Sequence, residues 1–240
     1  MAGFFYQLGR LAGPKLRKAN WFFRSLTGSE AEAIAAEYQA GRYLAQAIAQ
    51  EMEVDSDPCV AQLLQEVGTR LASRVKNRHR KFAFRSLQSS EANAFALPGG
   101  FISVTRPLVE LCERNPDEMA FILGHEMAHV IRKHAMDRMM TNSVLDAAIR
   151  AVPIGGLMRS QLGGILRQLL EQRYSQDQEL DADQLGVRLA CAAGFRADAA
   201  VRLLDRLKRR SGESPGIGEY FSTHPPFDLR IKRVRHFLKP

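Results

Sequence analysis

Residues 115–134 read NPDEMAFILGHEMAHVIRKH, and this stretch decides the fold. Its beginning carries the signals of a helix start: Asn115 can cap the helix, Pro116 suits the first helical position, and Glu118 stands three residues after the cap. Apolar residues then recur at helical spacing as far as Val130. The stretch therefore predicts one continuous helix, which has no internal proline and is rigid enough to hold metal ligands.

The sequence H-E-x-x-H lies within this predicted helix. His125 and His129 are four residues apart, so both rings project from one face and can bind a single zinc ion. Glu126 lies about 100° around the helix axis from His125. It can therefore contact a water molecule at the metal instead of binding the metal itself, as a general base requires. The alternative is a pair of structural core histidines beside an unrelated glutamate.

A third metal ligand is expected on a later helix. The extended motif H-E-x-x-H-x-x-G-x-x-H is excluded, because this chain has Arg132 and Ala135 where glycine and histidine are required. His134 is expected on the opposite side of the helix, either at the surface or in the C-terminal turn of the helix. Glu179 and Asp183 share one face of a later acidic helix, so one can bind zinc while the other accepts an N–H from a ligand imidazole. Spacing leaves open which carboxylate does which, and a solvated acidic face is the alternative.

A small sheet is predicted before the H-E-x-x-H helix. Residues 82–87 alternate with a period of two, which indicates a strand. Residues 93–97 and 101–104 flank the turn sequence Pro98-Gly99-Gly100, which indicates a hairpin. Periodic segments after Pro107 are all helical. The fold class expected is therefore α+β and mostly helical, with a small sheet or hairpin preceding the H-E-x-x-H helix.

Composition fits an ordinary globular chain. The 240 residues are 45% hydrophobic and 25% charged, which excludes collagen-like and wholly disordered chains. The three cysteines are far apart and form no C-x-x-C pair, which argues against a disulfide framework or a thioredoxin-type redox site. No repeat or linker is evident, so residues 30–240 are expected to form a single domain.

Residues 1–29 are expected to form a separate basic amphipathic segment, in a chain of net charge +8. They mix Phe, Leu and Trp21 with Lys and Arg, and can either lie on an anionic membrane surface or dock on the protein's own core. The chain shows neither a signal peptide nor a transmembrane span, so a cytoplasmic protein with optional peripheral membrane contact is expected. No specific nucleic-acid partner is expected, because no reading motif accompanies the basic charge.

Four motifs, in the same order, resemble the zinc endopeptidase family that contains the CAAX prenyl endopeptidase, bacterial HtpX and the mitochondrial Oma-type protease. They are Asn93-Ala-Phe-Ala-Leu-Pro-Gly-Gly100, His125-Glu-Met-Ala-His129, Glu179-x-x-x-Asp183, and Ser222-Thr-His-Pro-Pro226 followed by Arg230. The prenyl endopeptidase and HtpX are integral membrane proteins. Because this chain has no predicted span, it is more similar to the Oma-like members.

The resemblance implies a zincin-like gluzincin fold with one zinc ion per chain, bound by His125, His129 and Glu179, with Asp183 behind these ligands. It also implies that His224 faces the metal with Arg230 beside it. Either side chain can then donate to the oxyanion formed on the substrate. Alternatively, His224 can fill the open zinc position and hold the enzyme latent.

The resemblance further implies that substrate binds along the strand that precedes the helix, formed by Asn93, Ala94, Phe95 and Ala96. An extended peptide would pair there, main chain to main chain, with an edge strand in 93–97 or 101–104. A plain core hairpin is the alternative.

The expected function is zinc-dependent endopeptidase hydrolysis of extended or misfolded polypeptides, as in protein quality control. A catalytically silent, zinc-stabilised chaperone or membrane-surface module is the alternative. The general base Glu126 favours the enzyme, because a silent site has little need of a base between two ligands. A nucleic-acid-associated protein, suggested by the basic patches alone, is the weakest alternative.

Overall fold

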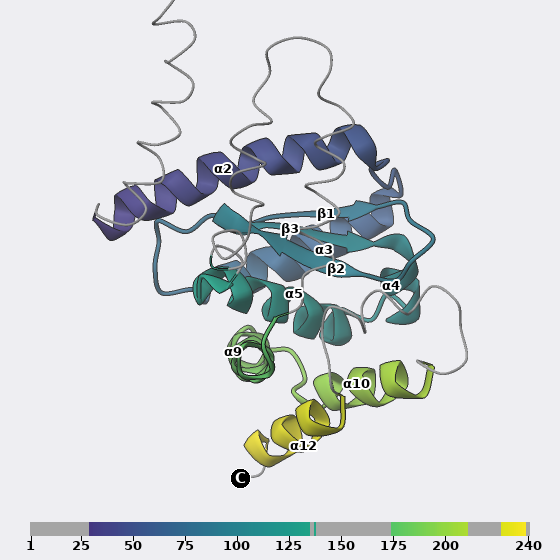
Figure 1. Cartoon of the computed structure of the whole chain (residues 1–240). Coiled ribbons are helices and arrows are strands. Elements are labelled where there is room, and N and C mark those ends of the chain that lie inside the picture. The colour runs from purple at the N-terminus through teal and green to yellow at the C-terminus, as the bar shows by residue number, and fades with distance from the viewer. Residues whose placement is uncertain (1–28, 135–136, 138–173, 211–226, 239–240) are drawn as a thin grey trace, which may run out of the picture.

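A computed structural model describes residues 29–134, 137, 174–210 and 227–238 (Figure 1). The first half contains α2 (Glu30–Glu51), α3 (Pro58–Ala72), β1 (Ala83–Leu87), β2 (Ala94–Leu97), the 3₁₀ turn η1 (Pro98–Gly100), β3 (Phe101–Thr105) and α4 (Arg106–Leu111). The second half contains α5 (Pro116–Ile131), α9 (Gln176–Ala192), α10 (Asp198–Arg210) and α12 (Phe227–Phe237). The predicted α+β, mostly helical class is confirmed, and the small sheet does precede the H-E-x-x-H helix.

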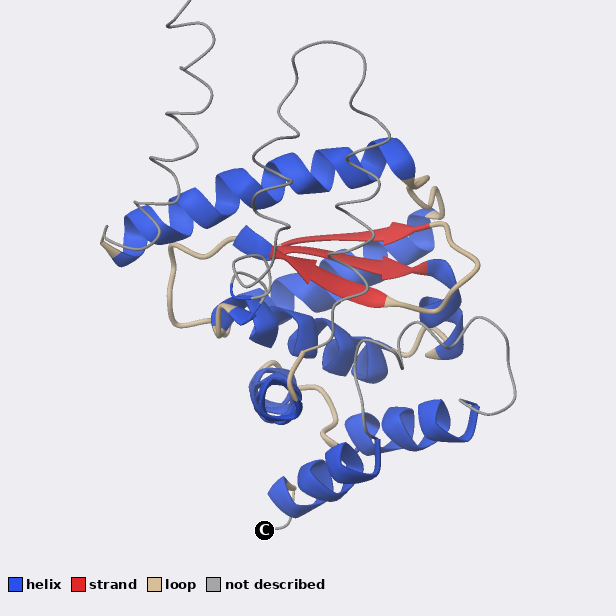
Figure 2. Cartoon of the chain, in the orientation of Figure 1, coloured by secondary structure: helices blue, strands red, loops and turns tan. Residues whose placement is uncertain are grey.

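The described strands form one sheet in the order β1-β3-β2 (Figure 2). Strand β3 is antiparallel to β2, as the predicted hairpin requires, and parallel to β1. Because β3 lies between the other two strands, the prediction that residues 101–104 offer a free edge is wrong. In the described part of the chain, β2 pairs only with β3 and lies at the edge of the sheet.

The hairpin turn depends on glycine. Gly99 has a φ of 76° and Gly100 a φ of 94°, a backbone conformation that other residues adopt only with strain. Helix α2 lies directly on this turn, since a Cβ added to Gly99 would come within 2.4 Å of the Cα of Tyr38. The turn therefore fixes both the register of the hairpin and the position of α2 over the sheet (Figure 1).

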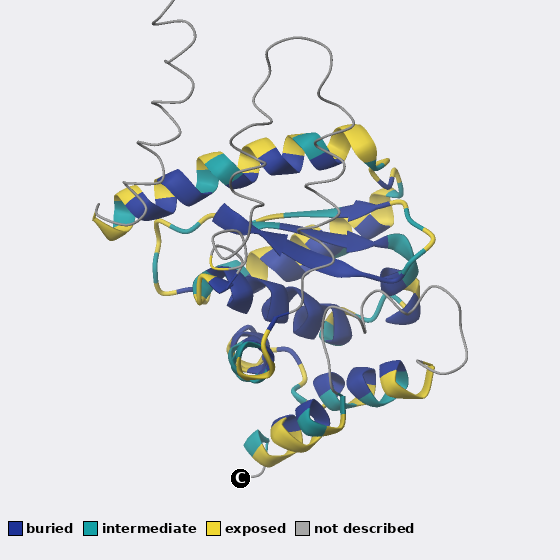
Figure 3. Ribbon diagram, in the orientation of Figure 1, coloured by how far each residue is buried: buried dark blue, intermediate teal, exposed yellow. Residues whose placement is uncertain are grey.

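Helix α5 runs through the middle of the molecule. The side chain of Asn115 caps it by accepting from the backbone N–H groups of Asp117 and Glu118, at 3.0 and 3.2 Å. Every residue from Glu118 to Val130 is buried (Figure 3). A helix that is buried all round must pack on several partners at once.

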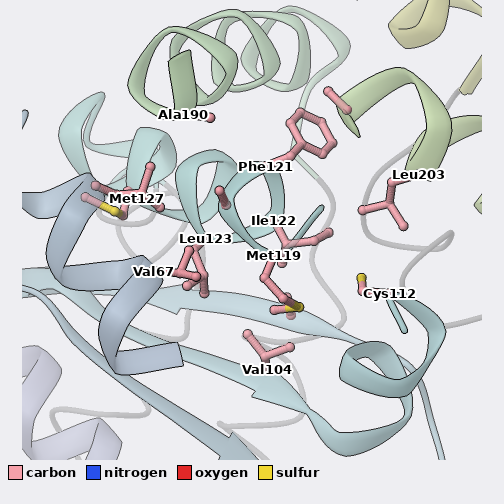
Figure 4. Close-up of a cluster of buried hydrophobic side chains, with 14 of the residues drawn as sticks. Val67, Val104, Cys112, Met119, Phe121, Ile122, Leu123, Met127, Ala190 and Leu203 are labelled. Atoms are coloured by element: carbon pink, nitrogen blue, oxygen red, sulfur yellow. The ribbon is translucent and has the colours of Figure 1, made fainter. Parts of the chain in front are cut away.

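The apolar core forms around α5. The side chains of α5 contact residues of α3, β3, α9 and α10. Figure 4 shows Val67, Val104, Ala190 and Leu203 of these elements around the α5 residues Met119, Phe121, Ile122, Leu123 and Met127. Fully burying a side chain of this size stabilises the folded state by roughly 1.5–3 kcal/mol. The metal-ligand candidates on α5 are therefore anchored by the most buried helix of the described structure.

Helices α5 and α9 cross where two glycines meet. A Cβ added to Gly124 would lie 2.8 Å from the carbonyl oxygen of Gly186, and a Cβ added to Gly186 would lie 2.8 Å from the backbone nitrogen of His125. Both neighbours are backbone atoms that cannot move aside, so only glycine allows the helices to approach this closely. The crossing brings the histidine face of α5 against the acidic face of α9.

Two further expectations concern residues 1–29 and membrane-spanning helices. The predicted amphipathic segment, residues 1–29, lies outside the described residues apart from Ser29, which caps α2. Among the helices that are described, none combines the length and the apolar character needed to cross a bilayer.

Candidate metal centre

Three side chains predicted to bind zinc meet at the crossing of α5 and α9. The Nε2 atoms of His125 and His129 are 3.1 Å apart. A carboxylate oxygen of Glu179 lies 3.6 Å from Nε2 of His125, and its other oxygen lies 3.3 Å from Nε2 of His129. All three side chains are fully buried. The structure thus brings together the ligand set that the sequence suggested.

The spacing of these donor atoms fits a zinc ion. Ligands bound tetrahedrally at about 2.0–2.1 Å from zinc are separated from one another by roughly 3.3 Å. The measured separations of 3.1, 3.3 and 3.6 Å bracket that value. Two imidazoles and one carboxylate also form a donor set that is typical of catalytic zinc sites, which leave the fourth position for water.

Asp183 orients the first histidine. Its Oδ1 lies 2.9 Å from Nδ1 of His125, so the ring donates Nδ1–H to the carboxylate and directs the lone pair of Nε2 toward the other two ligands. Burial lowers the pKa of His125, but the hydrogen bond to Asp183 and the charge of Glu179 raise it more, and the net shift is upward. Metal binding at this ring therefore competes with a proton.

Arg230 lies behind both carboxylates. Its Nε and Nη2 donate to the two oxygens of Asp183, both at 2.8 Å, and its Nη1 is 3.4 Å from Glu179. Burial raises the pKa of Asp183, yet the charge and hydrogen bonds of Arg230 outweigh it and hold that pKa below its ordinary value. The guanidinium is fully buried. Through its contacts, Arg230 on α12 holds Asp183 and Glu179 of α9 in place.

We expect Arg230→Met to destabilise the protein by about 3–5 kcal/mol at neutral pH, because it leaves two buried carboxylates without their counter-charge. Urea unfolding of the metal-free protein, followed by circular dichroism, measures the change. The matched control is Arg235→Met on the same helix. Arg235 is exposed and pairs with Asp205 at the surface, so its loss should cost at most about 1 kcal/mol.

The cost of this variant should also depend on pH. In the native protein the lowered pKa of Asp183 contributes stability above its ordinary value of 3.8, and this stability is lost as pH falls toward the lowered value. In the variant, burial still raises the pKa of Asp183, and of the two side chains that lowered it only His125 remains. The difference between the two proteins should therefore be largest at neutral pH and shrink as pH falls toward 4. An equal difference at all pH values would contradict the ion pair.

His129 has a different partner, which the sequence did not reveal. Its Nδ1 lies 3.1 Å from Nδ1 of His134, which is only 9% exposed. His134 follows the turn that ends α5, which agrees with one of its two expected places, but the expectations that it lies at the surface and faces away from the ligands are wrong. Helix α5 ends at Ile131, and Lys133, with a φ of 63°, lies in the turn that precedes His134 and its contact with His129. Burial lowers the pKa of His134, which favours its neutral ring.

An aromatic ring covers one face of His129. Tyr174 stacks on it with ring centroids 3.7 Å apart and planes inclined by 14°. Tyr174 is buried and directly precedes Ser175, the residue that caps α9. It fixes the orientation of the imidazole plane by packing.

The other predicted site residues have distinct positions. Glu126 is buried beside His125 on α5, with 1% of its surface exposed. Residues 94–96 belong to the edge strand β2, which packs against α5, and Asn93 directly precedes them. His224 lies outside the described residues.

The buried cluster carries an excess of formal negative charge. Glu126, Glu179 and Asp183 contribute three negative charges and Arg230 contributes one positive charge, while the histidine rings can be neutral. Within the described residues, these formal charges of −3 and +1 leave −2, which has the sign that a bound cation would offset. Charge therefore agrees with donor geometry.

Comparison with known proteins gave concordant matches. A profile described as "Peptidase family M48" matches residues 58–238. The mitochondrial metalloendopeptidase OMA1 of Schizosaccharomyces pombe is 26% identical over 159 residues, which cover 66% of this chain and 47% of that protein. The beta-barrel assembly-enhancing protease of Escherichia coli O157:H7 is 26% identical over 216 residues, which cover 85% of this chain and 44% of that protein.

A third relative matches over most of its length. The metalloprotease YcaL of Escherichia coli K12 is 29% identical over 193 residues, which cover 76% of this chain and 74% of that protein. The chain thus spans less than half the length of the first two relatives and about three quarters of the third.

Proposed function

Because this chain belongs to peptidase family M48, and is therefore a metalloprotease, we propose that it is a zinc-dependent endopeptidase acting on extended or misfolded polypeptides. One observation carries the proposal. The donor atoms of His125, His129 and Glu179 converge at separations that suit zinc, and Glu126, next to His125 on α5, is buried as well.

The proposed mechanism divides the work among these residues. His125, His129 and Glu179 would hold the zinc ion. When bound, zinc would supply a Lewis acid that polarises the scissile carbonyl and makes water acidic near neutral pH. Glu126 would take the proton from the attacking water and pass it to the leaving amine. Protein side chains thus move the proton at both stages.

The remaining buried residues would position this machinery. Asp183 would keep the Nε2 of His125 unprotonated by accepting the hydrogen of Nδ1. Arg230, which was expected beside the oxyanion, contacts Asp183 and Glu179 through three of its nitrogens. We therefore assign Arg230 a positioning role. For His224, stabilisation of the oxyanion and blocking of the zinc both stay predictions.

The substrate would bind as an added strand. An extended peptide would pair with the main chain along Asn93, Ala94, Phe95 and Ala96, where β2 lies against α5. Pairing of this kind reads the main chain and selects for unfolded segments, because a folded protein seldom presents a free extended strand. Action in protein quality control follows from this selection. Contact of residues 1–29 with an anionic membrane stays a prediction.

Metal removal and restoration tests the proposed activity. We expect the protein stripped of metal by a chelator to leave an unfolded casein intact. One equivalent of zinc per chain should restore cleavage, whereas magnesium should not, because it prefers oxygen ligands in octahedral geometry. A tightly folded protein offered at the same concentration should resist cleavage. Cleavage by the metal-free protein, or none by the zinc-loaded protein, would contradict the proposal.

A further inference from the structure

We propose that His134 is a positioning residue for the second zinc ligand. It would fix the tautomer and the ring orientation of His129 by accepting a hydrogen bond from Nδ1. This inference rests on the proposed zinc site. It gives His129 the kind of buried partner that His125 has in Asp183, but one that carries no charge.

The tautomer follows from the contacts of His129. Its Nε2 lies 3.1 Å from Nε2 of His125 and 3.3 Å from a carboxylate oxygen of Glu179, so this nitrogen faces the point where the ligands converge. A nitrogen that binds metal must carry a lone pair, so the hydrogen of a neutral ring lies on Nδ1. That Nδ1–H points to Nδ1 of His134, 3.1 Å away. His134 must then accept through Nδ1 and carry its own hydrogen on Nε2.

The backbone and the packing hold His134 in this place. Lys133 adopts a left-handed conformation, with a φ of 63°, in the turn that ends α5. The His134 ring meets the His129 ring edge-on, with centroids 5.2 Å apart and planes inclined by 64°. Tyr174 packs against both rings, with centroids 3.7 Å from His129 and 6.2 Å from His134. A strained backbone conformation such as that of Lys133 persists only where the surrounding structure holds it, here beside the packed ring of His134.

As a hydrogen-bond acceptor for His129, the neutral ring of His134 adds no charge to the buried site, whereas a carboxylate would add one. Asp183 and Glu179 already place two negative charges beside one buried guanidinium. A further buried carboxylate against His129 would need another counter-charge. An imidazole orients the ligand without that cost, so the site gains a fixed tautomer and no further negative charge.

Two variants of nearly equal size separate hydrogen bonding from packing. In His134→Asn, the side-chain oxygen lies near the place of Nδ1 and can accept from His129, whereas His134→Leu cannot accept. Zinc affinity is measured by competition with a chromophoric chelator. We expect His134→Leu to bind zinc about 10–100-fold more weakly than the native chain, and His134→Asn to recover most of the loss. His79→Phe, at an exposed histidine, is the control and should not change affinity.

The outcomes are distinguishable. If the native chain binds no zinc, the proposed function fails. If the native chain binds zinc and His134→Leu binds it equally well, the role of His134 fails while the metal site stands. Equal weakening in the Leu and Asn variants would also overturn the inference, because packing alone would then explain it.

A measurement on the native protein covers the case in which a variant does not fold. Nitrogen chemical shifts of the zinc-loaded chain report which ring nitrogens carry hydrogen. We expect hydrogen on Nδ1 of His129 and none on Nδ1 of His134. The reverse assignment would overturn the inference.

Discussion

Replacing Glu126 with glutamine is expected to lower kcat for peptide hydrolysis by about 10²–10⁴-fold, the usual contribution of a general base. Glutamine has nearly the same shape as glutamate and can fill the same buried position, but it cannot take a proton from water. Glu126 is adjacent to His125 and is 1% exposed, which places the proposed base next to a ligand and away from bulk water. Cleavage of an unfolded protein by the zinc-loaded variant measures the loss.

Zinc content decides how that loss is interpreted. The variant should keep one zinc per chain, because His125, His129 and Glu179 are unchanged. Glu66→Gln, at an exposed position on α3, is the control and should cleave normally. Undiminished hydrolysis by Glu126→Gln would reject the assigned base. If the prediction holds, the same variant can trap clients from a lysate, since it should bind polypeptides without cutting them.

Replacing Glu179 with alanine is expected to remove both the metal and the activity. Its two oxygens lie 3.6 Å from Nε2 of His125 and 3.3 Å from Nε2 of His129, so Glu179 supplies the third metal ligand. Two imidazoles alone hold zinc too weakly to retain it against a chelator. Elemental analysis after dialysis against a mild chelator should give close to one zinc per native chain and close to none per variant chain.

Asp181 provides the matched control for this experiment. It lies two residues after Glu179 on the same helix, but it pairs with Arg132 at the surface, at 2.7 Å. Asp181→Ala should therefore keep full zinc content and activity. Circular dichroism of all three proteins checks that α9 still folds. Full zinc occupancy in Glu179→Ala would exclude it as a ligand.

Local signals made the centre of the fold predictable. The Asn115-Pro116 start and the spacing of His125 and His129 lie within one helix, and the Gly99-Gly100 turn lies within one hairpin. Each of these patterns is decided by residues close in the sequence. The fold class and the faces carrying the metal ligands could therefore be predicted.

Other features depend on contacts between distant segments, or on a helix end that no glycine or proline marks in the sequence. The parallel pairing of β1 with β3 makes β3 the central strand, and no hairpin pattern reveals it. The position of His134 depends on where α5 ends, and neither glycine nor proline marks that end. The contacts of Arg230 with Asp183 span 47 residues of sequence, so its positioning role became visible only with the helices packed together.

The 47-residue separation of Asp183 and Arg230 also affects the order in which the site can fold during synthesis. On the ribosome, α5 and α9 emerge well before α12, so the acidic pair is synthesised ahead of the cation that neutralises it. Until Arg230 arrives, burying those carboxylates is unfavourable and the nascent chain leaves them hydrated. The proposed cutting centre would thereby stay unassembled until α12 has been synthesised.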